Sequence, residues 1–527
     1  MPPPMLLLRL ACLLFLASAC GLRAAPASAA PVEQWGIFEV SLPGPTAGNP
    51  FLEVDFSARF THDASTFDVP GFYDGNGTYR VRFMPDQTGD WHYETRSNAP
   101  ALAGQSGNFT VGPPGPGDHG PVRVAATYHF AYADGTAYFP LGTTLYRWTH
   151  VNDAREELTL HTLAASPFNK VRMIIPPIQW DPAHGEPLFF PFAGTPPLGW
   201  DFTRFNPDFF RHLEQRVGQL RDLGIEADLI LFAPYDHGRL GFDRMPAAVD
   251  DRYVRYVVAR LAAYRNVWWS LANEYDLMHE KNEADWDRLF QIIQKADPYQ
   301  HLRSIHHSVL IYDNSQPWVT HASIQNGSAV EDAGRAELYR DVWRKPVIFD
   351  EVKYEGNIDK RWGQLTAQEM VQRFWEGTIA GTYVGHGEVL QVAGSNDTWT
   401  DSGGELRGQS PARLAFLRSI VATAPNLDPI DKWQDSRLAG QPGQYYLLYF
   451  GAAAPANWPF VLPKEGLTEG ATFAVDILDT WNMTVTPVPG KFTVNKRDAY
   501  TFADAQGRSI PLPAQPWLAL RIRRVSP

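Results

Sequence analysis

The stretch Val267-Trp-Trp-Ser-Leu-Ala-Asn-Glu-Tyr-Asp276 combines a short apolar run with a polar end. Apolar runs of this length between helical segments are typical of strands in a parallel sheet, where both faces are covered. The run stops at Asn273-Glu274, and a carboxylate at the carboxyl end of such a strand lies at the face where α/β domains collect their binding groups. The stretch therefore predicts an α/β domain with Glu274 at the mouth of its sheet.

A second run of the same kind, Pro346-Val-Ile-Phe-Asp-Glu351, also ends in an acid. Between residues 122 and 427 strand candidates alternate with segments of helical periodicity, which favours a (β/α)₈ TIM barrel. A doubly wound sheet is the alternative, but no Gly-rich turn follows the first strand candidate. The eight strand candidates are Tyr138–Gly142, Val171–Pro176, Glu226–Ala233, Val267–Ala272, His301–His306, Trp318–Ser323, Pro346–Asp350 and Gly381–His386.

The segments on either side of this region alternate apolar and polar residues with a period of two. Phe51–Phe60 and Thr78–Phe83 show the pattern before the barrel, and Tyr445–Phe450 shows it after the barrel. Short alternating strands separated by turn residues are typical of β-sandwiches. The expected organisation is a signal peptide at 1–30, an Ig-like β-sandwich at 31–115, a barrel at 122–427 and a second β-sandwich at 428–527.

Composition indicates a globular chain. Its 527 residues are 44% hydrophobic and 20% charged, and its net charge is −12. No basic stripe is present, so we expect no nucleic-acid partner. Both cysteines, Cys12 and Cys20, lie in the first thirty residues, which leaves no thiol for the predicted domains.

The first thirty residues are typical of an export signal. Met5–Ala19 is apolar apart from Arg9, and Ala27-Ser-Ala29 offers a small-residue cleavage site. Lipoprotein processing at Cys20 is the alternative. No later stretch is long and apolar enough to predict a membrane span. We therefore expect a secreted or periplasmic protein, with a lipid anchor at Cys20 left open.

The two acids suggest a reaction. In an eight-unit barrel Glu274 ends strand four and Glu351 ends strand seven, on roughly opposite sides of the mouth. Glycosidic bond cleavage uses such a pair, one acid to protonate the departing oxygen and the other to attack or to activate water. A gap of about 5–5.5 Å gives retention, and about 6.5–9.5 Å gives inversion. The pattern predicts a glycoside hydrolase acting on a carbohydrate.

The barrel resembles the large clan of retaining glycoside hydrolases in which Asn-Glu closes strand four and a lone Glu closes strand seven. The resemblance implies that Glu274 is the acid/base, that Glu351 is the nucleophile, and that hydrolysis proceeds by double displacement. It also implies that Asn273 holds the sugar 2-hydroxyl and that Arg172 contacts the nucleophile.

The order of the domains is similar to that of bacterial secreted glycosidases related to apiosidase-like proteins. The similarity covers nearly the whole chain after the signal segment and includes Gly142-Thr-Thr144, Tyr354-Glu-Gly356 and His386-Gly-Glu388. Some members of that group carry Asp rather than Glu at strand four, whereas this chain has Glu274.

Other polar and aromatic residues follow the predicted strands and could form a site for sugar hydroxyls. Each histidine alone is more often a structural residue with satisfied hydrogen bonds than a ligand-binding one. No zinc-type spacing is present, so we expect no metal and no cofactor. The substrate-binding candidates are Asn273, Arg172, Tyr146, Tyr235, His307, His321, His386 and Trp399.

Several alternatives remain open. Glu355 is a second candidate for the reacting acid, and Asp276 either tunes Glu274 or forms a surface salt bridge. Asp350 should point away from Glu351, because side chains alternate along a strand. The aromatic residues in the loop 181–210 either stack on sugar or form a self-packed lid. Rival functions are a non-catalytic carbohydrate-binding or scaffold protein and a transglycosylase.

Overall fold

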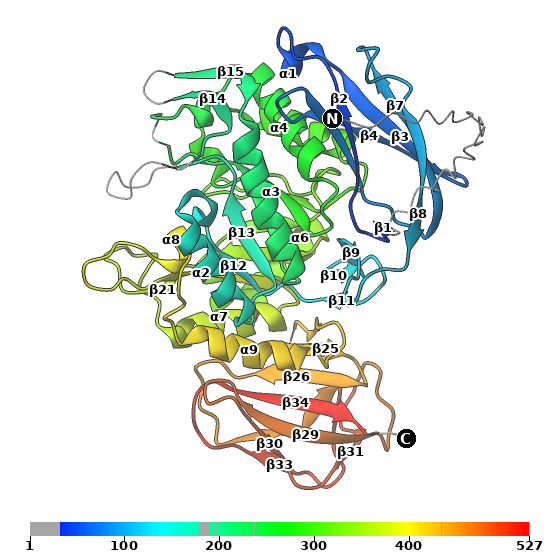
Figure 1. The fold of residues 1–527 in the computed structure, drawn as a ribbon. Coiled ribbons are helices and arrows are strands. Elements are labelled where there is room, and N and C mark those ends of the chain that lie inside the picture. Colours follow the sequence, from blue (N-terminus) through cyan, green and yellow to red (C-terminus); the bar gives the residue numbers. More distant parts are fainter. Residues whose placement is uncertain are drawn as a thin grey trace, which may run out of the picture. The chain divides into compact units, whose positions relative to one another are not determined.

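The structure is a computed structural model that describes residues 32–178, 187, 189–195, 199–236, 238–433 and 435–525. A barrel of parallel strands and outer helices lies between two β domains in the chain (Figure 1). The predicted fold class is confirmed. The predicted signal peptide, residues 1–30, lies outside the described residues.

The barrel is an eight-stranded parallel sheet in the order β18-β17-β16-β13-β12-β22-β20-β19, which leaves β18 and β19 as its two edges. Every strand is buried along most of its length, as expected where helices cover the outside and side chains fill the interior. In chain order the strands are β12 (Gly142–Thr144), β13 (Lys170–Ile174), β16 (Glu226–Phe232), β17 (Val267–Ala272), β18 (Arg303–Ser304), β19 (Ala322–Gln325), β20 (Val347–Glu351) and β22 (Tyr383–His386).

The outer helices begin at strong N-capping residues. Asn152, Asn206 and Asn282 cap three of them through their side chains, and Thr366 forms a capping box with Glu369. The apolar faces expected from the sequence, such as Phe210, Leu213, Val217 and Leu220, are buried against the sheet. The helices are α2 (Asp153–Ala164), α3 (Pro207–Asp222), α4 (Ala247–Leu261), α5 (Glu283–Ala296), α6 (Ala333–Trp343), α7 (Ala367–Ile379), the short α8 (Trp399–Ser402) and α9 (Ser410–Val421).

The fifth strand–helix unit departs from the expectation. Residues 305–321, between β18 and β19, form no helix and only turns and irregular structure. This connection contains Asp313, Asn314, Ser315 and Pro317, which favour turns and interrupt helical periodicity. The prediction of eight complete strand–helix units is therefore wrong in this unit.

A small sheet closes the amino-terminal end of the barrel. It consists of β9 (Val122–Ala125), β10 (His129–Tyr132) and β11 (Ala137–Tyr138), in the order β11-β10-β9. Phe130 and Tyr138 from this sheet pack with Trp268 at the start of β17. The first barrel strand therefore starts at Gly142, and Tyr138, predicted to lie in that strand, belongs to the floor.

The amino-terminal β domain pairs a five-stranded sheet, β1-β8-β7-β3-β4, with a three-stranded sheet, β2-β6-β5. Its aromatic core includes Phe60 stacked on Phe83 with ring centroids 4.2 Å apart. Its elements are β1 (Val32–Glu33), β2 (Phe38–Pro43), α1 (Pro50–Glu53), β3 (Phe56–His62), β4 (Ser65–Pro70), β5 (Phe72–Tyr73), β6 (Thr78–Phe83), β7 (Gly89–Ser97) and β8 (Ser106–Gly112).

Buried charges join this domain to the barrel helices. Arg82 of β6 donates to Glu214 of α3 at 3.0 Å and to the carbonyl of Arg260 in α4 at 2.9 Å. Arg260 in turn pairs with Glu214 at 2.5 Å and with Asp74 at 2.9 Å. Because these charges are buried, each needs its partner in place, so the interface has a defined geometry.

The carboxyl-terminal domain is an antiparallel β structure built on a nine-stranded sheet, with β27 and β33 pairing separately. Its strands are β24 (Asp428–Asp431), β25 (Asp435–Gln441), β26 (Tyr445–Tyr449), β27 (Asn457–Pro459), β28 (Val461–Pro463), β29 (Thr472–Asp479), β30 (Thr484–Pro487), β31 (Phe492–Lys496), β32 (Thr501–Asp504), β33 (Ser509–Pro511) and β34 (Leu518–Arg524).

One face of this domain packs on helix α7. Trp375, which is fully buried, stacks on Tyr449 of β26 with centroids 5.4 Å apart. Leu447 and Ala519 belong to the same apolar cluster as the inner residues of α7. The domain therefore continues the core of the barrel's helical layer.

The aromatic loop after β13 is largely self-packed. Its strands β14 (Phe192–Thr195) and β15 (Gly199–Phe205) form an antiparallel hairpin. Phe192 and Phe205 are buried, and Phe205 stacks on Tyr256 with centroids 4.1 Å apart. These contacts favour the self-packed lid over exposed sugar-stacking rings. Residues 179–186, 188 and 196–198 of this loop lie outside the described residues.

Among the helices of the described residues, none has both the length and the apolarity needed to cross a bilayer.

Trp375→Ala should lower the free energy of unfolding by about 3–5 kcal/mol, because it removes a fully buried aromatic side chain and leaves a cavity between α7 and the carboxyl-terminal domain. Chemical denaturation monitored by circular dichroism measures the change. Trp375→Phe keeps the stacked ring and should cost much less. Equal losses in the two variants would contradict the role given to stacking on Tyr449.

Candidate active site

Glu274 lies immediately beyond the carboxyl end of β17, on an unusual backbone. Its φ is 43°, in the left-handed region that residues other than glycine seldom adopt. Strain of this kind persists where surrounding structure enforces it, often at functional sites. The turn leaves the carboxyl group half-buried, and the hydroxyl of Tyr235 donates to its Oε2 at 2.7 Å.

Glu351 is the last residue of β20 and is placed by a β-bulge. Ser323 pairs with Ile348 and Gln325 pairs with Glu351, so three steps along β20 match two along β19. The extra residue breaks the alternation of side chains, as bulges near functional sites commonly do. Both Asp350 and Glu351 consequently interact with groups inside the barrel. The prediction that Asp350 points away from Glu351 is therefore wrong.

One amide joins the two glutamates. Nε2 of Gln325 donates to Glu274 Oε1 at 3.0 Å and to Glu351 Oε2 at 2.9 Å. Two oxygens this close to one nitrogen are at most about 6 Å apart, below the range of about 6.5–9.5 Å that leaves room for an attacking water. The spacing suits direct attack by one carboxylate on an atom held between the two.

Glu351 is buried but surrounded by groups that stabilise its charge. Arg172 donates to Oε1 at 3.2 Å, Nε2 of His306 lies 3.3 Å from the same oxygen, and the hydroxyl of Tyr146 donates to it as well. Burial alone would raise the pKa of the carboxyl, but His306, Arg172 and Tyr146 together hold that pKa well below its ordinary value. Glu351 is therefore ionised.

A chain of hydrogen bonds connects the two acids around the rim. Arg172 donates to Asn273 Oδ1 as well as to Glu351, and Asn273 Nδ2 donates to the hydroxyl of Tyr235, which in turn contacts Glu274. Arg172 comes from β13, whereas the others come from the ends of β16, β17 and β20. Four strands thus position one connected set of polar side chains.

A buried charge cluster lies one layer below the glutamates. Lys170 pairs with Asp228 at 2.6 Å and with Asp350 at 3.1 Å, and Asp350 also accepts from Ser323 at 2.6 Å. Burial opposes the charge of Lys170, but the two aspartates outweigh it and raise the pKa of its ammonium group. Burial likewise opposes ionisation of Asp350, yet Lys170 and Arg172 hold its pKa below the ordinary value.

Two further polar residues occupy the rim near Glu274. His307 accepts from the backbone N–H of Gln325 at 3.3 Å, and burial lowers the pKa of its imidazole to about 4, so it is neutral. Asp276 accepts from the backbone N–H groups of Ser308, Val309 and Leu310 at 2.6–2.9 Å. Asp276 thus fixes the loop after β18 and forms no surface salt bridge among the described residues.

Three substrate-binding candidates lie elsewhere. His321 precedes β19 at the amino-terminal end of the barrel, against Phe130 and Trp268. His386 pairs with Thr143 across β22 and β12, and its Nδ1 lies 2.9 Å from the hydroxyl of Thr143. Trp399 donates to that same hydroxyl at 2.8 Å.

The wrong assignments have two physical causes. Thr143 lies opposite Val171, whose side chain packs in the layer outside the strands, so His386 and Trp399 also lie on the outer side of the sheet. His321 was assigned to the wrong end of its strand, because β19 begins at Ala322 rather than at Trp318. These three predictions of substrate contact are corrected accordingly.

Glu355 does not join the pair. It is buried, and its carboxylate accepts from the backbone N–H groups of Gln409 and Ser410 and from the hydroxyl of Ser410. These contacts hold the first turn of α9, where the helix dipole favours an anion. Glu355 is therefore engaged by α9 and does not contact Glu274 or Glu351 through any of these hydrogen bonds.

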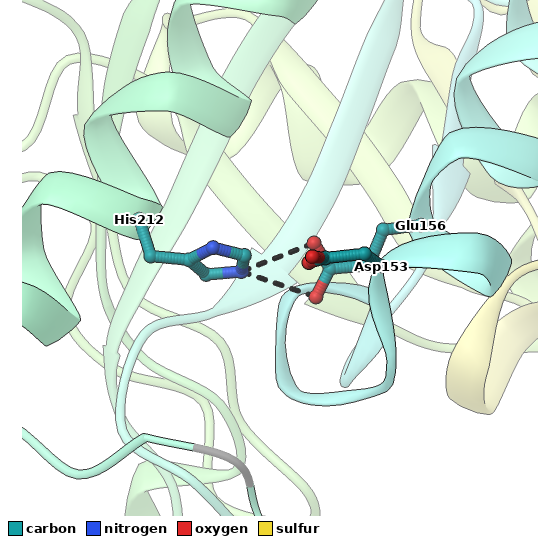
Figure 2. A group of neighbouring side chains, drawn as sticks. All are labelled: Asp153, Glu156 and His212. Carbon is teal, nitrogen blue, oxygen red and sulfur yellow. Dashed lines mark hydrogen bonds and ion pairs between the residues drawn. The ribbon is translucent and has the colours of Figure 1, made fainter.

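A cluster of possible metal ligands at the start of α2 is already neutralised. Figure 2 shows Asp153 and Glu156 with His212, whose Nε2 lies 3.0 Å from Glu156 Oε2. The guanidinium of Arg216 pairs with Glu156 and lies 3.4 Å from Asp153. Because Arg216 already supplies the positive charge, these residues do not fit a metal site.

A mostly apolar cavity of about 140 Å³ is lined in part by Tyr146, whose hydroxyl donates to Glu351. Tyr146 and Tyr354 contribute to its wall, and their hydroxyls lie 3.3 Å apart next to Glu351. Trp362 packs edge-on against Tyr354 with centroids 5.6 Å apart. The cavity therefore extends the site from Glu351 toward residues that follow β20 and β22.

Sequence reasoning missed three residues of the site. Gln325 lies two residues beyond the expected sixth strand, Trp318–Ser323, and His306 is named only as the last residue of the expected strand His301–His306. Tyr354 appeared only within the motif Tyr354-Glu-Gly356. A correct end for β19 would have indicated Gln325, because polar side chains at carboxyl ends of barrel strands meet at one face.

Three family models match the chain. The model described as "Apiosidase-like, catalytic domain" matches residues 125–427, and two domains of unknown function, DUF5060 and DUF5605, match residues 31–98 and 433–523. No curated protein matches the chain significantly.

Solved structures resemble the whole molecule. A proposed glycoside hydrolase from Bacteroides vulgatus ATCC 8482 is 42% identical, with a TM-score of 0.91, over 94% of this chain and 100% of the other. A family 5 glycoside hydrolase from the same organism is 14% identical (TM-score 0.57; 77% of this chain, 93% of the other). A further structure named "Glycoside hydrolase" is 15% identical (TM-score 0.57; 77% and 97%). At such low identity the last two show the fold alone.

Lys170→Met should lower the free energy of unfolding by about 3–5 kcal/mol near neutral pH, because it leaves Asp228 and Asp350 buried without their shared cation. Without Lys170 the pKa of Asp350 should rise above that of the unfolded chain, and the pKa of Asp228, which burial already raises, should rise further. The penalty should therefore shrink as the pH falls from about 8 to about 5.

Denaturant unfolding of wild type and variant at both pH values measures this difference. Lys432→Met removes a half-exposed partner of Asp341 and serves as the control, with an expected cost below about 1 kcal/mol at either pH. A penalty for Lys170→Met that grows on acidification would contradict the assigned charges.

Proposed function

The chain belongs to the apiosidase-like family of glycoside hydrolases, and on that premise we propose that it hydrolyses O-glycosidic bonds of an oligo- or polysaccharide by a retaining double displacement. Glu351 is the nucleophile and Glu274 is the acid/base. The observation that carries this proposal is the single amide of Gln325 that bridges both carboxylates, because it limits their separation to a distance compatible with direct attack.

In the first step a carboxylate oxygen of Glu351 attacks the anomeric carbon of the bound sugar. The glycosidic C–O bond breaks as Glu274 transfers its proton to the departing oxygen, and a glycosyl ester of Glu351 forms. The burial of Glu351 next to Arg172 and Tyr146 supports this role, since its charge is held in position without a water shell.

In the second step water attacks the same anomeric carbon from the side of Glu274. The ionised Glu274 takes a proton from the water, the ester bond to Glu351 breaks, and both acids return to their starting states. Two inversions give a product with the configuration of the substrate. The half-buried position of Glu274 is consistent with access for leaving group and water.

The surrounding residues position the substrate and the nucleophile. Asn273 is oriented by Arg172 and Tyr235, which supports a contact with the sugar 2-hydroxyl. The amide of Gln325 lies between the acids, where it would meet the sugar and exchange its carboxylate contacts for hydroxyl contacts. Tyr146 is assigned to the nucleophile rather than to the sugar, because its hydroxyl donates to Glu351.

The enzyme is proposed to act outside the cytoplasm. The apolar segment Met5–Ala19 and the small residues at 27–29 support export, and Cys20 leaves lipid anchoring as a second route to the same location. An exported location suits a polysaccharide substrate, which is too large to be taken up intact.

Glu351→Gln should abolish hydrolysis of aryl glycosides, while the protein stays folded. Glu274→Gln should slow the hydrolysis of substrates with poor leaving groups by about 10²–10⁴-fold. Substrates with good leaving groups should be affected much less, because only a poor leaving group needs protonation. Turnover of substrates that differ in leaving group measures this pattern. The control, Glu376→Gln, changes a buried glutamate of α7 outside the site and should leave turnover intact.

The anomeric configuration of the first product, followed by NMR, tests the mechanism. Retention is the expected result, and an inverted first product would rule out Glu351 as a nucleophile. Transfer to an added alcohol in preference to water would identify a transglycosylase with the same residues. Glycan binding without any product from wild type would favour the non-catalytic alternative.

Tyr146→Phe should shift the acid limb of the pH profile of kcat/KM upward. The hydroxyl of Tyr146 is one of the groups that lower the pKa of Glu351, so its loss raises that pKa and a higher pH is needed for ionisation. Tyr235→Phe removes a donor to Glu274 instead and should leave the acid limb in place. A shared shift in both variants would contradict the separate roles.

A further inference from the structure

A second cluster of titratable side chains, two glutamates and a histidine, lies on the outer side of the barrel strands, away from Glu274 and Glu351. It consists of Glu355 in β21 (Glu355–Gly356), His386 at the end of β22 and Glu388 in β23 (Glu388–Val389). β21 and β23 pair in parallel, so Glu355 and Glu388 lie side by side. All three side chains are at most 5% exposed.

The two carboxylates converge, and among the described residues neither forms an ion pair with a lysine or arginine side chain. Glu388 accepts from the backbone N–H groups of Arg407 and Gly408 at 2.7 and 2.8 Å, whereas Glu355 bonds to Gln409 and Ser410. Among the described residues these partners are uncharged groups, with no lysine or arginine side chain. A Cβ at Gly408 would lie within 2.7 Å of an oxygen of each carboxylate, which shows how closely the two converge. Buried charges of like sign require compensation.

His386 supplies an unused nitrogen to this cluster. Its Nδ1 lies 2.9 Å from the hydroxyl of Thr143, while its Nε2 is buried and has no hydrogen-bond partner among the described residues. An Nδ1–H donated to Thr143 leaves a lone pair on Nε2, the arrangement usual for a metal-binding histidine. One ligand atom from each of His386, Glu355 and Glu388 lies within 4.8 Å of the other two.

We propose that Glu355, His386 and Glu388 bind one divalent transition-metal ion, with zinc as the best chemical fit. One imidazole nitrogen and two carboxylates match the borderline ligand set of zinc, whereas calcium and magnesium favour oxygen alone. Tetrahedral zinc ligands lie about 3.3–3.5 Å apart, so a small contraction of the cluster completes the site.

This cluster differs from the group at Asp153, Glu156 and His212 in how its negative charge is compensated. Arg216 forms an ion pair with Glu156 in that group, whereas among the described residues Arg407 acts on Glu388 only through space and no lysine or arginine side chain forms an ion pair with Glu355 or Glu388. The sequence spacing, which predicted no metal, did not reveal the site because its residues are brought together only by the pairing of β21 with β23 and of β12 with β22.

The ion would hold the segments after β20 and β22 in place without contacting the substrate. Glu355 adjoins Tyr354, whose hydroxyl lies 3.3 Å from that of Tyr146 beside Glu351. Glu355 and Glu388 both hold the loop that leads into α9. A metal here therefore ties the segments after β20 and β22 to α9, and the proposal does not depend on the assigned catalytic roles.

Metal analysis of the untagged, purified full-length protein tests the site. Wild type is stripped with a chelator, dialysed against zinc chloride and freed of unbound metal, and bound metal is measured by inductively coupled plasma mass spectrometry. The expected result is about one zinc per chain, with a melting temperature on the order of 5 °C above that of the stripped protein. Less than a tenth of an equivalent (~0.1 per chain) after reloading would overturn the proposal.

Variants locate the ion. Glu388→Gln and His386→Asn should each lose the bound zinc and the zinc-dependent rise in melting temperature, whereas Asp153→Asn, in the other cluster, should keep both. Zinc lost from Asp153→Asn but kept in Glu388→Gln would refute the assigned ligands. If the cluster variants do not fold, X-ray absorption at the zinc edge of loaded wild type decides. One nitrogen with carboxylate oxygens supports the site, and a shell with two or more histidines rejects it.

Discussion

The negative charge of Glu351, held in the mouth of the barrel, is the interaction on which the rest of the site depends. A buried carboxylate is costly unless donors and cations surround it. Arg172 in β13, His306 in the segment after β18 and Tyr146 in the segment after β12 supply that compensation. Arg172 also donates to Asn273, so the side chain that stabilises the charge of Glu351 also orients the residue before Glu274.

Charges of alternating sign continue below the site. Lys170 and its partners Asp228 and Asp350 occupy the next interior layer, and the aromatic floor of Phe130, Tyr138 and Trp268 closes the end of the barrel. The aromatic floor protects the charged layer, because water reaching Lys170 from the amino-terminal end of the barrel would weaken its ion pairs. The barrel interior thus changes from apolar at the floor to charged at the mouth.

Two backbone irregularities convert a regular barrel into this site. The bulge in β20 puts both Asp350 and Glu351 inside, where a regular strand would face one of them outward. The left-handed backbone of Glu274 ends β17 and leaves its side chain in reach of Gln325 and Tyr235. The amino-terminal β domain contacts helices α3 and α4 of the barrel, and the carboxyl-terminal β domain contacts α7. Both domains therefore stabilise the helical layer that surrounds the strands.

The sequence by itself determined the barrel, the β character of the flanking segments and the two strands that end in Glu274 and Glu351, because apolar periodicity and strand-end polarity are local properties. Strand ends also pointed to Tyr146 and Tyr235, and the family resemblance pointed to Asn273 and Arg172; all four lie in the hydrogen-bond network around Glu274 and Glu351. Only the tertiary structure decided which side chains face the mouth. Because β19 starts four residues later than expected, Gln325 lies at its carboxyl end within the site, whereas His321 lies before its amino-terminal end and outside the site. His386 turns outward by its pairing with Thr143, and Asp350 turns inward through the bulge. Register and bulges arise from hydrogen bonds between strands distant in the chain, and no local pattern of residues encodes those distances.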